Sequence, residues 1–230
     1  MSDSGFRLLL LGAPGAGKGT QAALLAKTLG VPHIATGDMF RAAKAAGSPM
    51  GVMARKYMDR GELVPDKVTI GIVEERLQQS DVAHGWVLDG FPRTAAQAAA
   101  LDDLLARLGQ HLDAVVKLTV PREELIRRLT GRRVCPNCNA NYHVVSAPPK
   151  RDGVCDRCGH ELEQREDDSE ATVMHRLDVY HDSTRPLIAF YEKKGLLHRV
   201  DGTMPVPAVN AAILAAARSG ARAGAHVKAS

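Results

Sequence analysis

Short apolar runs and longer amphipathic stretches alternate along most of this 230-residue chain. The apolar runs are bounded by glycine, proline or polar residues, which is typical of buried strands. The stretches between them repeat apolar side chains at helical spacing. We predict strands at 6–11, 31–35, 85–88, 114–120 and 196–200, and helices at 20–29, 67–79 and 94–108.

Strands that alternate with helices favour an α/β fold, with a parallel sheet covered by helices on both faces. Two segments interrupt the alternation: 36–64 has a helical pattern, whereas 131–168 is rich in paired cysteines, proline and glycine. We interpret both segments as excursions from one core. Residues 218–230 are rich in alanine and glycine and carry only basic charges, so we predict a frayed or disordered end.

Composition limits the classes of protein that need to be considered. With 45% hydrophobic and 24% charged residues, the chain is typical of a globular protein with its own core. We find neither an apolar run near the roughly 18 residues of a membrane span nor a secretory signal, and we expect a cytoplasmic protein. A net charge of +4 would fit nucleotides, nucleic acid or no particular partner.

The residues after the first predicted strand follow the phosphate-loop pattern Gly-x-x-x-x-Gly-Lys, over residues 12–18. Glycines let several N–H groups point at an anion, the next helix adds its positive end, and the lysine contacts β- and γ-phosphates. The strict pattern has Ser or Thr directly after the lysine, whereas Gly19 stands there and Thr20 follows. The pattern therefore does not assign the usual hydroxyl contact to Mg²⁺. The alternative interpretation of the whole segment is a glycine turn that binds no ligand.

Two Cys-x-x-Cys pairs are separated by 16 residues, which is the spacing of a four-thiolate zinc site. The four cysteines are Cys135, Cys138, Cys155 and Cys158. Disulfides, unrelated thiols, or a contribution from His143 or His160 are the alternatives. A closed four-cysteine site is structural, because it leaves no open position for water. A nucleic-acid-binding ribbon is disfavoured, since 131–168 holds six Lys/Arg against seven Asp/Glu.

Two further segments place chemistry directly after predicted strands, where ligands bind in parallel α/β folds. Asp89 follows the third strand, and in a phosphate-loop protein a carboxylate there would order Mg²⁺. Thr36 and Arg41 follow the second strand and would present a hydroxyl and a guanidinium at a helix start. The alternatives are an Asp-Gly turn in the first case, and a helix cap with a solvated arginine in the second.

Together these motifs resemble the adenylate kinases, in the variant with a long zinc-bearing lid. The resemblance extends over about residues 6–214. Its matching stretches are LGAPGAGKGTQ (11–21), TGDMFR (36–41), GELVPD (61–66), LDGFPRTAAQA (88–98), GRRVCPNC (131–138), YHVVSAPPK (142–150), CDRCG (155–159), QREDD (164–168) and VDGTMPV (200–206).

The resemblance implies a P-loop nucleoside-monophosphate kinase fold with a five-stranded parallel sheet. The core would comprise 1–34, 65–130 and 169–217, with a mobile AMP-binding arm at 35–64, a zinc lid at 131–168 and a basic tail at 218–230. The implied reaction is ATP + AMP ⇌ 2 ADP with Mg²⁺, catalysed by a monomer with structural zinc. Nucleic acid and membranes are not expected as partners.

Site residues also follow from the resemblance. It assigns the ATP phosphates to Gly15, Ala16, Gly17, Lys18, Gly19 and Thr20. It assigns the AMP site to Thr36, Arg41, the backbone of Glu62, Leu63 and Val64, then Gly90, Phe91, Pro92, Arg93 and Gln97. Arg93 would hold the AMP phosphate. The resemblance assigns the clamp on the phosphates to Arg128, Arg132, Arg165 and Arg176, with Arg132 also contacting ATP and Arg165 and Arg176 also contacting AMP.

The resemblance further assigns the ATP base and ribose to Tyr142 and to the backbone near Gly202 and Met204. Asp89 would order Mg²⁺ through water. Met204 stands where lysine is frequent, which is harmless if only the backbone carbonyl is used there. Relatives that prefer UMP or CMP, or that use GTP, remain the alternatives within the class. The short lids of the pyrimidine kinases argue against that branch.

Overall fold

The computed structural model describes residues 5–227, with side chains up to residue 219. The strands are β1 (Arg7–Leu11), β2 (His33–Ala35), β3 (Trp86–Asp89), β4 (Ala114–Thr119), β5 (Arg132–Val134), β6 (Asn141–His143) and β7 (Leu197–Asp201). The α-helices are α1 (Lys18–Leu29), α2 (Thr36–Ala45), α3 (Pro49–Met58), α4 (Asp66–Leu77), α5 (Ala95–Arg107), α6 (Arg122–Thr130), α7 (Glu170–Val179), α8 (Leu187–Lys193) and α9 (Val206–Val227). Short turns are η1 (Ser80–Val82), η2 (Glu166–Asp168) and the π-helical η3 (Tyr180–Thr184).

Within residues 5–227, five of the strands form one sheet in the order β2-β3-β1-β4-β7. Every neighbouring pair in it is parallel; Leu8 of β1 lies opposite Val87 of β3 and Ala114 of β4. The carboxyl ends of all five strands therefore meet at one edge of the sheet. The predicted parallel sheet is confirmed, and the loops that carry the predicted chemistry leave from this edge.

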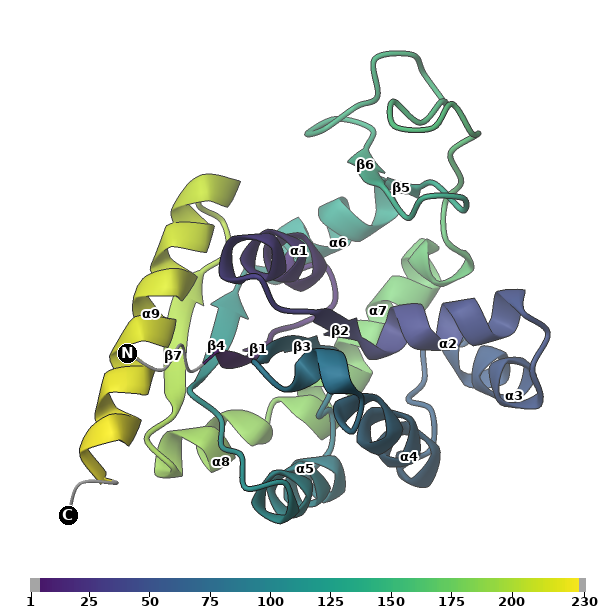
Figure 1. The fold of residues 1–230 in the computed structure, drawn as a ribbon. Coiled ribbons are helices and arrows are strands. Elements are labelled where there is room, and N and C mark those ends of the chain that lie inside the picture. Colours follow the sequence, from purple (N-terminus) through teal and green to yellow (C-terminus); the bar gives the residue numbers. More distant parts are fainter. Residues whose placement is uncertain (1–4, 228–230) are drawn as a thin grey trace.

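Alternate residues of β1 belong to two separate apolar clusters, as the two faces of a strand require. Leu8 and Leu10 pack with α1, α6, α7 and α9, whereas Leu9 and Leu11 pack with α4, α5 and α8. Helices thus cover both faces of the sheet (Figure 1). A strand buried on both faces reads as a continuous apolar run, which explains the sequence Leu-Leu-Leu-Leu at 8–11.

The two interruptions of the alternating pattern form separate projections from this core (Figure 1). Helices α2 and α3 pack against each other around Phe40, Ala54 and Val64. Strands β5 and β6 pair antiparallel and carry the loops of 135–162. Val134 and Glu163 exchange two backbone hydrogen bonds of 2.8 and 2.9 Å, so the two ends of these loops lie side by side.

The end of the chain differs from its prediction. Helix α9 continues through 218–227, where the sequence predicted a frayed or disordered end, and residues 228–230 lie outside the described part. Its alanines have the highest helix propensity, which accounts for the difference. No helix within the described residues has the length and apolar character needed to cross a bilayer.

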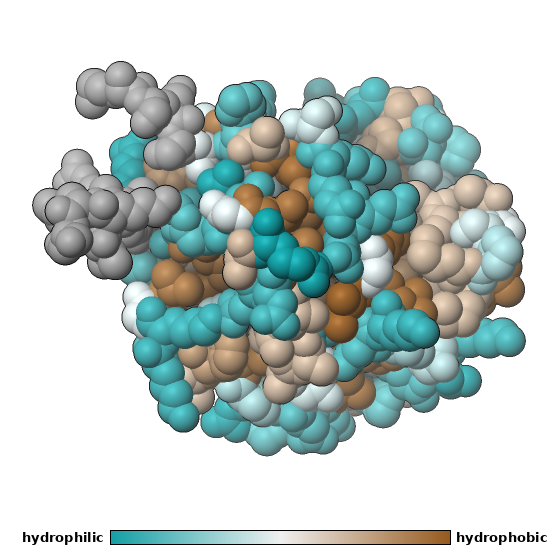
Figure 2. Space-filling view, turned by 60° about the horizontal axis from the view of Figure 1, so that its bottom comes forward, coloured by the Kyte–Doolittle hydropathy of each residue, from teal (hydrophilic) through white to brown (hydrophobic). Residues whose placement is uncertain are grey.

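Large exposed apolar side chains are scattered over the described surface. They are Leu24, Val52, Met174 and Val206, which belong to four different helices, and the neighbours Val144 and Val145, which lie in one turn after β6. Figure 2 shows hydrophilic side chains interspersed with small hydrophobic patches on one side of the molecule. Such single residues are normal on a protein surface and define no interface.

Candidate active site

The loop after β1 has the curled backbone that its glycines predict. Gly15 and Gly17 have φ angles of 83° and 95°, and Gly17 directly precedes the first residue of α1. At Gly12, with φ 150°, a Cβ atom would lie 2.9 Å from the Leu118 carbonyl oxygen. Conformation at Gly15 and Gly17, and space at Gly12, thus disfavour any side chain at these three positions. The loop leads directly into the N-terminus of α1, which favours the binding of an anion.

Lys18 is held inside this loop by its backbone. The Nζ atom donates hydrogen bonds to the carbonyl oxygens of Gly12 (2.7 Å) and Ala13 (3.0 Å). Burial disfavours its charged form and lowers its pKa to about 8, with Arg93, Arg176 and Arg132 adding to the effect and Asp89 opposing it. A partly desolvated cation of this kind gains charge stabilisation when an anion enters the loop.

Asp89 lies at the end of β3, close to the phosphate loop. A Cβ atom at Gly19 would lie 3.5 Å from its Oδ2 atom, and His33 Nε2 lies 3.9 Å from the same oxygen. Burial acts to raise the pKa of Asp89, but its neighbours His33, Lys18 and Arg93 outweigh burial and lower it. Asp89 is therefore a carboxylate next to the predicted phosphate site, which is the location expected of a residue that orders Mg²⁺.

Two predicted arginines converge on one buried carboxylate. Asp168 is fully buried and accepts hydrogen bonds from Arg132 Nε (2.7 Å) and Nη2 (2.5 Å) and from Arg176 Nη1 (3.1 Å). Asp167 adds a second carboxylate oxygen, 3.0 Å from Arg176. Both aspartates belong to the motif QREDD (164–168), but no role for them was predicted; their position next to Arg165 is the signal available in the sequence.

Arg165 has a different environment from the paired arginines. Its Nε atom is buried without a hydrogen-bond partner among the described residues. Burial lowers its pKa to about 9, and Arg132 and Arg41 add to this effect. Arg93 and Arg176 have pKa values lowered by burial and by neighbouring arginines. The arginines of this cluster are close enough to repel one another, which is the electrostatic signature of an anion-binding site.

A pocket next to this cluster contains most of the predicted AMP residues. Its lining includes Thr36, Glu62, Leu63, Val64, Gly90, Arg93 and Gln97. Gly90 carries the tightest contact: its φ is 81°, and a Cβ atom there would lie 2.8 Å from Thr36 Oγ1. The Gly90 carbonyl accepts hydrogen bonds from Thr36 Oγ1 (2.9 Å) and Arg93 Nε (2.8 Å). Thr184 Oγ1 also donates to the Arg93 carbonyl, at 2.9 Å.

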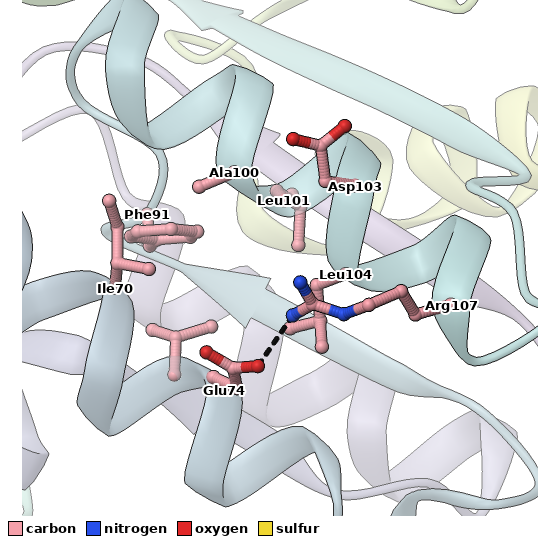
Figure 3. A pocket seen from close by; sticks show the side chains of 9 residues that line it. Ile70, Glu74, Phe91, Ala100, Leu101, Asp103, Leu104 and Arg107 are labelled. Carbon is pink, nitrogen blue, oxygen red and sulfur yellow. Dashed lines mark hydrogen bonds and ion pairs between the residues drawn. The ribbon is translucent and has the colours of Figure 1, made fainter.

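The other predicted AMP residues do not line this pocket. Arg41 pairs with Asp38 in the first turns of α2. Pro92 is buried, and the Phe91 side chain lies in a second cavity, of about 130 Å³, between α4 and α5. Figure 3 shows Phe91 next to Ile70 and across the cavity from Leu101, and it marks the ion pair between Glu74 and Arg107. Because Gly90 and Arg93 on either side line the pocket, residues 91–92 adjoin the site through their backbone and not through their side chains.

Arg128 and Gly202 are brought together, although they are far apart in sequence. Arg128 Nη1 donates to the Gly202 carbonyl oxygen at 3.0 Å, and Glu124 Oε1 accepts from Arg128 Nε at 2.6 Å. Met204 is half-buried against the apolar cluster that contains α1 and α9. Tyr142 lies elsewhere, in the cysteine cluster, where its hydroxyl lies 3.5 Å from Cys155 Sγ.

The four cysteines form one cluster, with their sulfur atoms all within 4.8 Å of one another. Cys135 and Cys158 are 3.4 Å apart and Cys138 and Cys155 are 3.5 Å apart, too long for disulfide bonds. Tetrahedral zinc with bonds of about 2.3 Å would separate its sulfurs by about 3.8 Å. The donor set therefore fits the predicted structural zinc.

Electrostatics in the cluster also favour a thiolate. Burial opposes ionisation of Cys155, but hydrogen bonds from Tyr142 and from the N–H groups of Arg157 and Cys158 lower its pKa to about 6. His143 is not part of the cluster, because its Nδ1 accepts from the N–H groups of Val145 (3.0 Å) and Ser146 (3.1 Å) and its Nε2 lies 3.1 Å from the Arg127 carbonyl oxygen. His160 does not belong to the cluster of the four sulfur donors.

A glycine loop between a central parallel strand and a helix, facing a group of half-buried arginines, defines a phosphate-loop kinase of the α/β class. The family model for adenylate kinase matches residues 10–196. An adenylate kinase of Carboxydothermus hydrogenoformans is 58% identical over 207 residues, covering 90% of this chain and 97% of the relative. Adenylate kinases of Geobacter sp. strain M21 (57%, covering 92% and 99%) and Geobacillus sp. strain WCH70 (56%, covering 90% and 95%) are similar as well. The chain belongs to the adenylate kinase family.

Proposed function

We propose that this protein catalyses the reversible, Mg²⁺-dependent reaction ATP + AMP ⇌ 2 ADP. The observation that carries the proposal is the position of Lys18, between the glycine loop and a group of arginines that includes Arg93 and Arg176. The pocket lined by Thr36, Arg93 and Gln97 adjoins this group and would hold AMP. The remaining predicted site residues keep the roles that the resemblance implies.

In this mechanism the chain positions two anions and offsets their charge. The attacking AMP phosphate is already ionised at neutral pH, so no general base is required. Lys18 and the arginines stabilise the charge that spreads over the transferred phosphoryl group. Mg²⁺, when bound, supplies further positive charge at the phosphates, and Asp89 is the residue that would orient its water ligands.

We further propose that 35–64 and 131–168 move relative to the core. Water competes with AMP as the phosphoryl acceptor, so both substrates must be enclosed before transfer. Zinc would give the lid one fixed shape, and Cys135, Cys138, Cys155 and Cys158 would hold it. A monomeric, cytoplasmic enzyme without nucleic-acid or membrane partners is also part of the proposal, and this part rests on the resemblance alone.

The decisive experiment measures ADP formation from ATP and AMP, with metal analysis of the same sample. We expect rapid turnover with AMP, little with UMP, little when GTP replaces ATP, and one zinc per chain. In the Arg93→Ala variant we expect kcat/KM for AMP to fall by at least about 10²-fold, because a buried phosphate contact is lost. Arg107→Ala, which removes an exposed arginine paired with Glu74, is the matched control. Faster turnover with another monophosphate would contradict the substrate assignment.

Lys18 also makes the reaction pH-dependent. Its pKa of about 8 lies below the ordinary 10.5, so the free enzyme loses this positive charge as the pH rises through 8. We expect kcat/KM for ATP to fall above about pH 8, whereas kcat falls only at higher pH because bound phosphates favour the charged lysine. Lys18→Arg should remove the fall between pH 8 and 10, whatever its absolute rate. The same profile in both enzymes would refute this origin.

A further inference from the structure

Asp66, the first residue of α4, is hydrogen-bonded to the start of α5. Its Oδ1 atom accepts from Gln97 Nε2 at 2.7 Å, and its Oδ2 atom accepts from Thr94 Oγ1 at 2.9 Å. Thr94 caps α5 and accepts in turn from the Gln97 N–H at 3.2 Å. The side chains of Asp66, Thr94 and Gln97 thus form one network that joins α4 to the start of α5, and no role for Asp66 was predicted.

The other end of the Gln97 amide is held as well. Gln97 Oε1 accepts from the backbone N–H of Arg93 at 2.7 Å, and the side chain is 1% exposed. These two contacts fix which end of the amide is the donor and which is the acceptor. If the amide were turned over, its NH₂ group would face the Arg93 N–H, and its oxygen would face the Asp66 carboxylate.

Each end of this amide has hydrogen-bonding capacity to spare. Nε2 carries two protons and Oε1 two lone pairs, and the contacts among the described residues use one of each. Gln97 lines the pocket assigned to the monophosphate. The spare proton and the spare lone pair therefore offer one donor beside one acceptor, in an order that Asp66 and the Arg93 N–H determine.

We propose that Asp66 is a positioning residue that determines base specificity. It holds the Gln97 amide in the orientation whose free donor and acceptor are complementary to adenine. The inference rests on the proposed function. Adenine presents a ring nitrogen acceptor beside an amino donor, which complements the spare donor and acceptor of Gln97. Hypoxanthine and guanine present a ring N–H beside a carbonyl oxygen, which requires the opposite orientation. Asp66 opposes that orientation, because its carboxylate can only accept.

The test compares kcat/KM for AMP with kcat/KM for inosine monophosphate, at saturating MgATP. In Asp66→Ala we expect the AMP-to-IMP ratio to fall by about tenfold or more, the range for one lost hydrogen bond to a charged group. Most of the change should appear in KM, because Asp66 touches neither phosphate nor Lys18. Asp66→Asn keeps an acceptor oxygen but loses the charge, so we expect a smaller fall, of about threefold.

Asp81→Ala is the matched control, since Asp81 accepts two hydrogen bonds from Arg76 near the other end of α4 and should leave the ratio unchanged. An equal loss for both nucleotides, with the ratio within twofold of wild type, would make Asp66 merely structural and overturn the proposal. If thermal melting shows that Asp66→Ala does not fold, Asp66→Asn decides by the same criterion. A wild-type enzyme that does not phosphorylate AMP would instead refute the proposed function.

Discussion

Replacing Lys18 with methionine should lower kcat/KM by about 10³-fold or more, because an arginine or oxyanion donor removed from a comparable site has an effect of this size. The Nζ atom now donates to the carbonyls of Gly12 and Ala13, which places it inside the phosphate loop. Methionine fills similar space without a charge, so the loop keeps its shape and loses its central cation. The measurement is steady-state ADP formation from ATP and AMP.

The same substitution should not destabilise the protein. The pKa of Lys18 is about 8 in the folded protein and 10.5 in the unfolded chain. At pH 7, burial of the charged lysine therefore makes the free energy of folding less favourable. That cost is fully present below pH 8 and is relieved as the pH rises from 8 to 10.5. The variant should therefore melt at or above the wild-type temperature at pH 7. Lys27→Met, at an exposed position of the same helix, is the control; near-normal turnover of Lys18→Met would remove the phosphate assignment.

Removing zinc has the second large expected effect, and it acts on stability. The apolar cluster of the segment 131–168 consists of Cys135, Ala140, Cys155 and Leu162, with Cys138 and Tyr142 beside it, so half of it is cysteine proposed to bind zinc. Without metal, too little apolar surface remains to order this segment. We expect the melting temperature to fall by about 10 °C or more, which corresponds to a loss of roughly 3 kcal/mol in a chain of this size.

Activity separates a structural role for the metal from a catalytic one. At 10 °C the metal-free protein, assayed with excess Mg²⁺, should retain much more activity than Lys18→Met, because a closed four-thiolate site binds no reacting water. Adding zinc back should restore both the melting temperature and the rate. Metal-free protein as inactive at 10 °C as Lys18→Met would show that the structural interpretation is wrong.

The parts of this molecule that the sequence predicts are those set by local periodicity or spacing. Helices cover both faces of β1, so all of its residues from 8 to 11 are apolar, and this continuous apolar run predicts a central strand. The glycine loop and the paired cysteines are recognisable because backbone curl and tetrahedral coordination each require fixed residue types at fixed intervals.

Contacts between distant residues were not predictable in this way. Asp168 lies 36 residues from Arg132 and Asp66 lies 31 from Gln97, and no local periodicity or spacing connects either aspartate with its distant partner. Phe91 stands within a binding motif, yet its side chain lies in a different cavity. The glycines and basic charges of 218–230 predicted a frayed end, whereas helix α9 extends to Val227, in keeping with the high helix propensity of its alanines.

The two ends of the segment 131–168 lie side by side, which has a practical consequence for protein engineering. Arg132 and Asp168 join its two ends through side chains, and Val134 and Glu163 join them again through the backbone. Residues 135–162 therefore enter and leave the rest of the molecule at one point. Since the entropy of closing a loop rises only slowly with its length, we expect modules of other lengths to be tolerated between Val134 and Glu163. Such a replacement would remove β6 together with its pairing to β5, but it should leave the five-stranded sheet of the core unchanged.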